Sequence, residues 1–154
     1  TFKYLNTEKK NIFLNIYGDG PLKNKVLKKI EFLKLSKNIR LHNPQKNISK
    51  ILKNTDIFFL FSDYEGVPNV LLEAQSYGIP IIAKKVGGIP ECIQENYSGY
   101  FLKYNSIKEN SEYILNLLKK KKFIKKRNLN KIKNNLTKFN PKNAVNDVIK
   151  VYEK

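Results

Sequence analysis

Two carboxylates, Glu65 and Glu73, stand eight positions apart within the segment Ser62–Ala74. Glu65 lies in a segment with Gly and Pro that follows an apolar run, whereas Glu73 lies within an apolar pattern of helical spacing. An ionised carboxylate only accepts hydrogen bonds, so its two oxygens can hold two neighbouring hydroxyl groups. The pair therefore favours a site that binds vicinal diols, such as those of sugars and riboses.

The residues between the two acids suit an anionic or oxygen-rich ligand. Gly66 allows a close approach of ligand to backbone, and the amides up to Val70 come at or before the start of a helix. Free N–H groups and the helix dipole both favour negative charge there. The alternative is that Glu65 caps the helix and Glu73 is solvated, and local chemistry alone leaves both interpretations open.

Two further glycine-containing loops follow predicted strands. Gly87–Gly88 permits either close approach to a ligand or a tight connection into the next helix. The segment Gly18–Pro21 resembles a turn, and it matches neither the phosphate-binding P-loop nor the three-glycine dinucleotide fingerprint, so we do not expect an NAD site.

The chain has one histidine and one cysteine, and each has a structural interpretation besides a functional one. His42, the only histidine, ends a predicted strand, where it contacts a ligand or is a half-exposed polar residue. Cys92, the only cysteine, is interpreted as a small buried hydrophobe rather than a nucleophile.

The elements that position these residues alternate between strand and helix. Predicted strands cover residues 12–17, 39–42, 57–61, 79–83 and 100–102. Predicted helices cover residues 22–35, 48–54, 69–77, 89–93, 107–118, 121–138 and 144–152. The continuous apolar run Ile57–Phe61 predicts a strand buried on both faces. This α/β alternation predicts a doubly wound parallel sheet with helices on both faces, which binds ligands beyond the carboxyl ends of its strands.

Composition narrows the class of protein. The 154 residues are 41% hydrophobic and 28% charged, which suits one globular domain, and no apolar run is long enough to span a membrane. One cysteine and one histidine exclude a disulfide framework and a Cys- or His-cluster metal site.

The net charge of +17 has two interpretations. It indicates an anionic partner, namely nucleic acid, a nucleotide or a phospholipid surface, or else a general bias of the sequence toward Lys, Asn and Ile. The chain begins without Met, and we expect it to be a domain of a longer protein.

The order of these motifs resembles one family. The matching segments are Tyr17–Pro21, Thr55–Phe58, Ser62–Ala74, Gly78–Pro80, Gly87–Glu91 and Gly99–Leu102. Together they resemble the C-terminal, donor-binding domain of retaining GT-B glycosyltransferases of family 4, or group 1. The similarity covers about Asn11 to Leu118, and Glu65 and Glu73 match that family's Glu-(seven residues)-Glu pattern.

The resemblance implies a Rossmann-like domain, the C-terminal half of a GT-B fold, with specific roles for its residues. Residues 1–154 would form a single nucleotide-sugar-binding domain whose C-terminal helices cover about 106–154, and the N-terminal acceptor domain would lie outside this chain. Glu65 would contact hydroxyls of the donor sugar near the reaction centre, and Glu73 would hold the ribose hydroxyls. Backbone amides would come from Gly66, Val67, Pro68 and Asn69. Gly18 would contribute to substrate binding, and His42 would lie near the base.

The implied activity is transfer of a sugar from a UDP- or GDP-linked donor to a glycan or lipid-linked acceptor, with retention of configuration. No metal and no cofactor would be needed, and the product would be a bacterial surface glycan. The protein would be cytoplasmic, with a peripheral place on the inner face of the membrane as a further expectation. The Arg and Lys that bind the diphosphate in this family lie upstream of the first matching strand and outside this chain, so the isolated chain should not turn over.

Three alternatives remain at this stage. A basic nucleic-acid-binding module would use the block Lys119–Arg127, although Phe123 is the only aromatic residue near it. A sugar-nucleotide epimerase would need several acids and histidines in its cleft. The third alternative is a truncated, inactive copy. The sequence does not specify the base or the sugar of the donor, the acceptor, or the oligomeric state.

Overall fold

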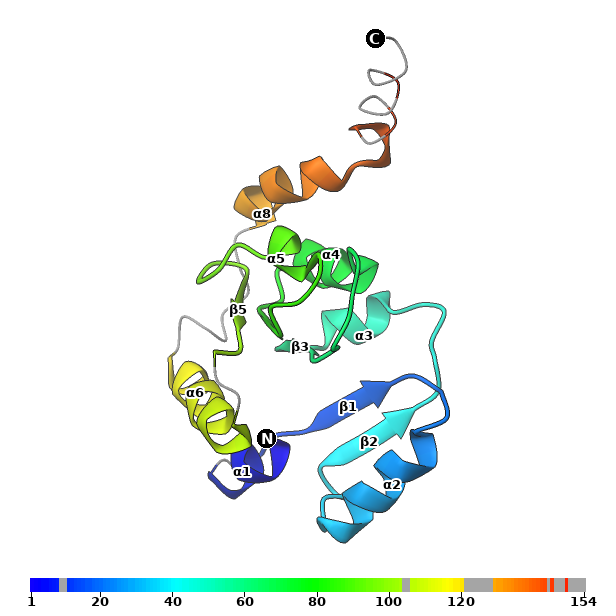
Figure 1. The fold of residues 1–154 in the computed structure, drawn as a ribbon, viewed down its shortest axis with the longest axis vertical. Helices are drawn as coiled ribbons and strands as arrows, with labels where there is room; N and C mark the ends of the chain where they lie inside the picture. The colour runs from blue at the N-terminus through cyan, green and yellow to red at the C-terminus, as the bar shows by residue number, and fades with distance from the viewer. Residues whose placement is uncertain (9–10, 104–105, 121–128, 144, 146–148, 150–154) are drawn as a thin grey trace. The chain divides into compact units, whose positions relative to one another are not determined.

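The computed structural model describes residues 1–8, 11–103, 106–120, 129–143, 145 and 149. Helices and strands alternate along the chain, as predicted (Figure 1). The chain folds into two compact units, of which the first comprises residues 1–51 and 104–119 and the second residues 52–103 and 120–154. The described strands pair in two parallel sheets, one in each unit. That residues 1–154 form a single domain stays a prediction.

The first unit contains the parallel pair β1 (Leu14–Tyr17) and β2 (Ile39–His42), which are joined by α2 (Lys23–Phe32). Parallel strands need such a crossover connection, and here its helix also covers one face of the pair (Figure 1). The buried Ile30 of α2 packs in one cluster with Ile39, Leu14 and Ile16 of the strands. The register pairs Tyr17 with His42, so both strands end at the same edge.

Helices α1 (Phe2–Glu8) and α6 (Ile107–Lys119) pack against each other in the same unit. The sequence predicted α6 but not α1. The physical reason is that α1 buries a single side chain, Leu5, which is 2% exposed. One apolar position produces no helical periodicity, so α1 depends on its contact with α6 rather than on a pattern of its own.

The second unit is built on a parallel sheet with the strand order β3 (Phe58–Leu60), β4 (Ile81–Ala83) and β5 (Gly99–Phe101). Helix α3 (Ser49–Lys53), in which the boundary between the two units falls, precedes β3. Helix α4 (Asn69–Ser76) connects β3 to β4, and α5 (Ile89–Cys92) connects β4 to β5. All three residues of β4 are fully buried, as expected of the middle strand. The core joins Leu71 of α4 and Ile89 of α5 to residues of β4 and β5.

The prediction that residues 57–61 are buried on both faces is wrong for this structure. The three residues of β3 are half-buried, and the Phe61 side chain after them is 39% exposed. The reason is that β3 is an edge strand of its sheet, paired only with β4 among the described strands.

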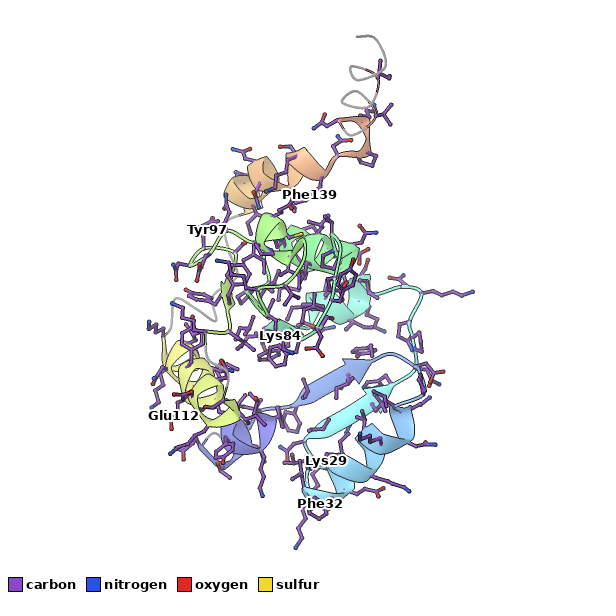
Figure 2. All side chains as sticks on the ribbon, in the orientation of Figure 1. Lys29, Phe32, Lys84, Tyr97, Glu112 and Phe139 are labelled. Atoms are coloured by element: carbon purple, nitrogen blue, oxygen red, sulfur yellow. The ribbon has the colours of Figure 1, made fainter. Side chains whose placement is uncertain are left out.

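The C-terminal part of the second unit returns to α4. Helix α8 (Leu129–Leu136) contacts α4, and Phe139, in the 3₁₀ turn η1 (Thr137–Phe139), packs against the core cluster (Figure 2). The Asn135 side chain donates a hydrogen bond to the carbonyl oxygen of Cys92 over 3.3 Å. Residues 121–128 of the predicted basic helix, and most of the predicted helix 144–152, lie outside the described residues. Among the described residues, no helix combines the length and the apolar character that crossing a membrane requires.

Candidate functional site

The loop that carries Glu65 lies at the carboxyl end of β3 and leads into α4. The Ser62 hydroxyl donates a hydrogen bond to Oε1 of Glu65 over 2.6 Å, and the Glu65 side chain is half-buried. The N-cap residue of α4 is Pro68, and among the described residues no side chain caps this helix end. The alternative interpretation, that Glu65 caps α4, is therefore wrong, and within the same part of the chain the second carboxylate oxygen of Glu65 has no hydrogen-bond partner.

The N-terminus of α4 presents free backbone donors. Within the described part of the chain, the amides of Asn69 and Val70 have no hydrogen-bond acceptor, whereas Leu71 donates to the carbonyl oxygen of Pro68 over 2.9 Å. Pro68 itself has no N–H group, so the expectation that it offers an amide was wrong. The helix dipole adds positive potential at the same end of the helix.

Glu73 lies on the exposed face of α4. It is four residues after Asn69, so the two side chains share one face of the helix. The opposite face holds Leu71, Ala74 and Gln75, which are all fully buried. These three side chains fix the rotation of the helix, and Glu73 consequently faces solvent without an ion pair among the described residues.

Gly87 and Gly88 pack directly against the backbone of the Glu65 loop. A Cβ atom on Gly87 would lie 1.8 Å from the carbonyl oxygen of Glu65, and one on Gly88 would lie 2.5 Å from that of Gly66. Gly87 also has a φ of +50°, which other residues rarely adopt. The close approach that these glycines permit is thus to a neighbouring loop, and it holds the Glu65 loop in place.

A second contact joins the same two loops. Lys84 directly follows β4, and its ammonium group forms an ion pair with Oδ1 of Asp63. The hydrogen bond and charge of Lys84 lower the pKa of the Asp63 carboxyl from its ordinary value. The sequence analysis missed this pair, although opposite charges just beyond two neighbouring parallel strands were a usable signal. Figure 2 labels Lys84 in the green part of the second unit.

Gly18 and His42 lie together in the first unit, at the carboxyl ends of β1 and β2. The Gly18 amide donates to the carbonyl oxygen of His42 over 3.1 Å. The His42 ring stacks on Tyr17 with centroids 4.6 Å apart and an angle of 13° between the ring planes. Nε2 of His42 lies 2.9 Å from Oδ1 of Asn15. His42 is thus held by two neighbours, and its contact with a base stays a prediction.

The loop after β1 is organised by Asp19. Its carboxylate accepts a hydrogen bond from the Gly20 amide over 2.9 Å and lies 3.4 Å from the Lys23 ammonium group. These interactions, the Gly20 hydrogen bond first, lower the pKa of Asp19 from its ordinary value. Because Asp19 is tied into its own turn, this loop fits the interpretation of Gly18–Pro21 as a turn.

The second unit also has an open hollow of about 600 Å³. Its lining residues are Leu72, Leu136, Thr137, Phe139, Asn140 and Pro141. None of the predicted site residues lines it. Within the described part of the chain, no group of three or more His, Cys, Asp or Glu side chains is arranged to hold a metal ion.

Comparisons with known proteins agree on one family. The family model "Glycosyl transferases group 1" matches residues 1–139. The Vi polysaccharide biosynthesis protein VipC/TviE of Salmonella typhi is 39% identical over 87 residues, which are 56% of this chain and 15% of that protein. The N-acetyl-alpha-D-glucosaminyl L-malate synthase of Bacillus anthracis is 33% identical over 106 residues, which are 69% of this chain and 28% of that protein.

A solved structure shares the fold. The crystal structure of Anabaena Alr3699/HepE in complex with UDP-glucose superposes on 99% of this chain with a TM-score of 0.79, at 15% sequence identity. This chain corresponds to 44% of that structure, and the matched residues make up less than a third of either curated relative.

Proposed function

Because the chain belongs to the group 1 family of glycosyl transferases, we propose that it is the donor-binding part of an enzyme that transfers a sugar from a nucleoside-diphosphate sugar to a glycan or lipid-linked acceptor, with retention of configuration. The family membership accounts for both carboxylates and the glycine loops. A nucleic-acid-binding module would leave these features unexplained.

The observation that carries the proposal is the arrangement around the start of α4. Glu65 comes before the helix and Glu73 lies one turn inside it. Between them are the amides of Asn69 and Val70, which have no acceptor among the residues that the structure describes. Carboxylates suit hydroxyl groups, and free amides at a helix N-terminus suit a diphosphate. This order matches the sequence of groups in a nucleoside-diphosphate sugar, which runs from sugar through diphosphate to ribose.

Each group has a distinct part in the proposed reaction. Glu65 accepts hydrogen bonds from hydroxyls of the donor sugar and so holds the sugar in position for the reaction. The amides of Asn69 and Val70 and the α4 dipole stabilise the negative charge that grows on the diphosphate as it leaves. Glu73 holds the ribose hydroxyls. The bond from the anomeric carbon to the diphosphate breaks, a bond from that carbon to the acceptor oxygen forms, and the proton of the acceptor hydroxyl passes to the departing diphosphate.

Release of nucleoside diphosphate from donor sugars, measured with the full-length protein, tests this proposal. The donors are UDP-glucose, UDP-N-acetylglucosamine, UDP-galactose and GDP-mannose, each without acceptor so that slow hydrolysis is the readout. We expect release from at least one donor, and we expect Glu65→Gln to reduce that release far more than it weakens nucleotide binding. Release from none of the donors, or undiminished release by Glu65→Gln, would contradict the proposal.

We also propose that the protein works on the cytoplasmic face of a membrane, where a lipid-linked acceptor would be reached. The support is the net charge of +17, because each Lys or Arg near an anionic lipid surface adds attraction. Sedimentation with vesicles tests this. We expect binding to vesicles that contain phosphatidylglycerol and little binding to pure phosphatidylcholine, and equal binding to both would contradict the idea.

A further inference from the structure

Lys84 connects the loop after β4 to the loop that carries Glu65. It follows β4 directly, and its own amide donates to the carbonyl oxygen of Leu60 at the end of β3 over 3.1 Å. Its ammonium group reaches Asp63, two residues before Glu65. The backbone of Lys84 is therefore fixed by the sheet, while its side chain points to the loop that carries Glu65.

We infer that Lys84 binds the diphosphate of the donor, and that Asp63 holds its ammonium group in position while no donor is bound. The inference rests on the proposed function and adds a cation to it. The donor diphosphate is negatively charged, and a lysine is a common point-charge partner of phosphate.

The ion pair with Asp63 is suited to being exchanged. The Asp63 side chain is 92% exposed and that of Lys84 is 39% exposed, so the pair lies largely in water. Exposed pairs are weak, because water screens the charges and two flexible side chains must be ordered. A diphosphate offers several charged oxygens in place of one carboxylate. The ammonium group can therefore move from Asp63 to the diphosphate without a large cost in free energy.

The next residue supplies a matched control. Lys85 carries the same charge one position further, but its ammonium group lies 5.7 Å from the centroid of the Phe101 ring. A cation over an aromatic face is held there by the ring quadrupole. Substitution of Lys85 therefore tests whether the loss of any lysine charge in this loop weakens nucleotide binding. If only the lysine that contacts Asp63 matters, the Lys85 variant binds nucleotide normally.

The experiment compares binding of UDP and of uridine to the full-length protein and to three variants. We expect Lys84→Gln to raise the Kd for UDP about tenfold, as loss of one charged hydrogen bond does, and to leave the Kd for uridine unchanged. Asp63→Asn should leave the Kd for UDP unchanged or lower it, because the ammonium group is then free. Lys85→Gln should change neither Kd.

The Asp63 variant separates diphosphate binding from mere support of the loop. If Asp63→Asn weakens UDP binding as much as Lys84→Gln does, the pair only positions the loop and the inference is overturned. An unchanged Kd for UDP in Lys84→Gln also overturns it, while the proposed function stands. If the unsubstituted protein does not bind UDP, the same comparison is made with GDP and guanosine, and if it binds neither UDP nor GDP the proposed function itself fails.

Discussion

Gly88 donates its backbone N–H to the carbonyl oxygen of Glu65 over 3.2 Å, and so joins two loops that follow neighbouring strands of one sheet. The adjacent Gly87 lies so close to the same carbonyl group that a side chain there has no room. The orientation of the Glu65 loop thus depends on backbone contacts with a loop some twenty residues later in the sequence. Substitutions at these glycines should act on the site without touching a ligand.

Gly87→Ala should destabilise the protein by about 2–4 kcal/mol, because the new Cβ would overlap the Glu65 carbonyl group and Gly87 has a positive φ. Gly66→Ala is the matched control in the facing loop, since nothing lies within 4 Å of its Cβ position. Denaturant unfolding measures both variants. Equal unfolding free energies for the two variants would show that the loops are not packed as described.

Much of the second unit could be predicted from the sequence, because the signals for its helices and strands lie within each segment. The apolar runs and the turn residues marked β4, α4 and α5 to within about two residues, because strands and helices of this size carry their own periodicity. The contact of Gly87 with Glu65 could not be predicted, since it joins two loops whose approach depends on the pairing of β3 with β4. The half-exposed β3 was mispredicted for the same reason, because burial depends on neighbours that an apolar run does not reveal.

Asp63 should titrate below the ordinary carboxyl range, because the Lys84 hydrogen bond and charge favour its ionised form. The ion pair is therefore present above the ordinary Asp pKa of about 3.9 and is lost as the pH falls through the lowered value. Carbon-detected NMR titration of the Asp63 carboxyl group measures this. Lys84→Gln should return the pKa toward its ordinary value, whereas Lys85→Gln should not, and identical titration curves in all three proteins would refute the pairing.

Cys92 should react slowly with iodoacetamide in the folded protein. Its side chain is fully buried, and desolvation raises the pKa of the thiol, which disfavours the reactive thiolate. Because the thiol pKa is higher in the folded protein than in the unfolded chain, the buried neutral thiol does not lower the free energy of unfolding below the ordinary thiol pKa of about 8.5. The free energy of unfolding then falls as the pH rises from that value through the folded-state pKa. We expect alkylation at pH 8 to be at least about 100-fold slower than in the urea-unfolded chain. Equal rates would mean that α5 does not bury Cys92.

The central claim is that Glu73 holds the ribose of a nucleotide on the exposed face of α4, and calorimetric titration of the full-length protein with UDP tests it most directly. Glu73→Ala should weaken binding by about 1.5–3 kcal/mol, because a charged hydrogen-bond acceptor is lost. Glu112→Ala, which removes another exposed glutamate, in α6, should bind UDP as the unsubstituted protein does. A Glu73→Ala protein whose Kd for UDP equals that of the Glu112→Ala control would contradict the account.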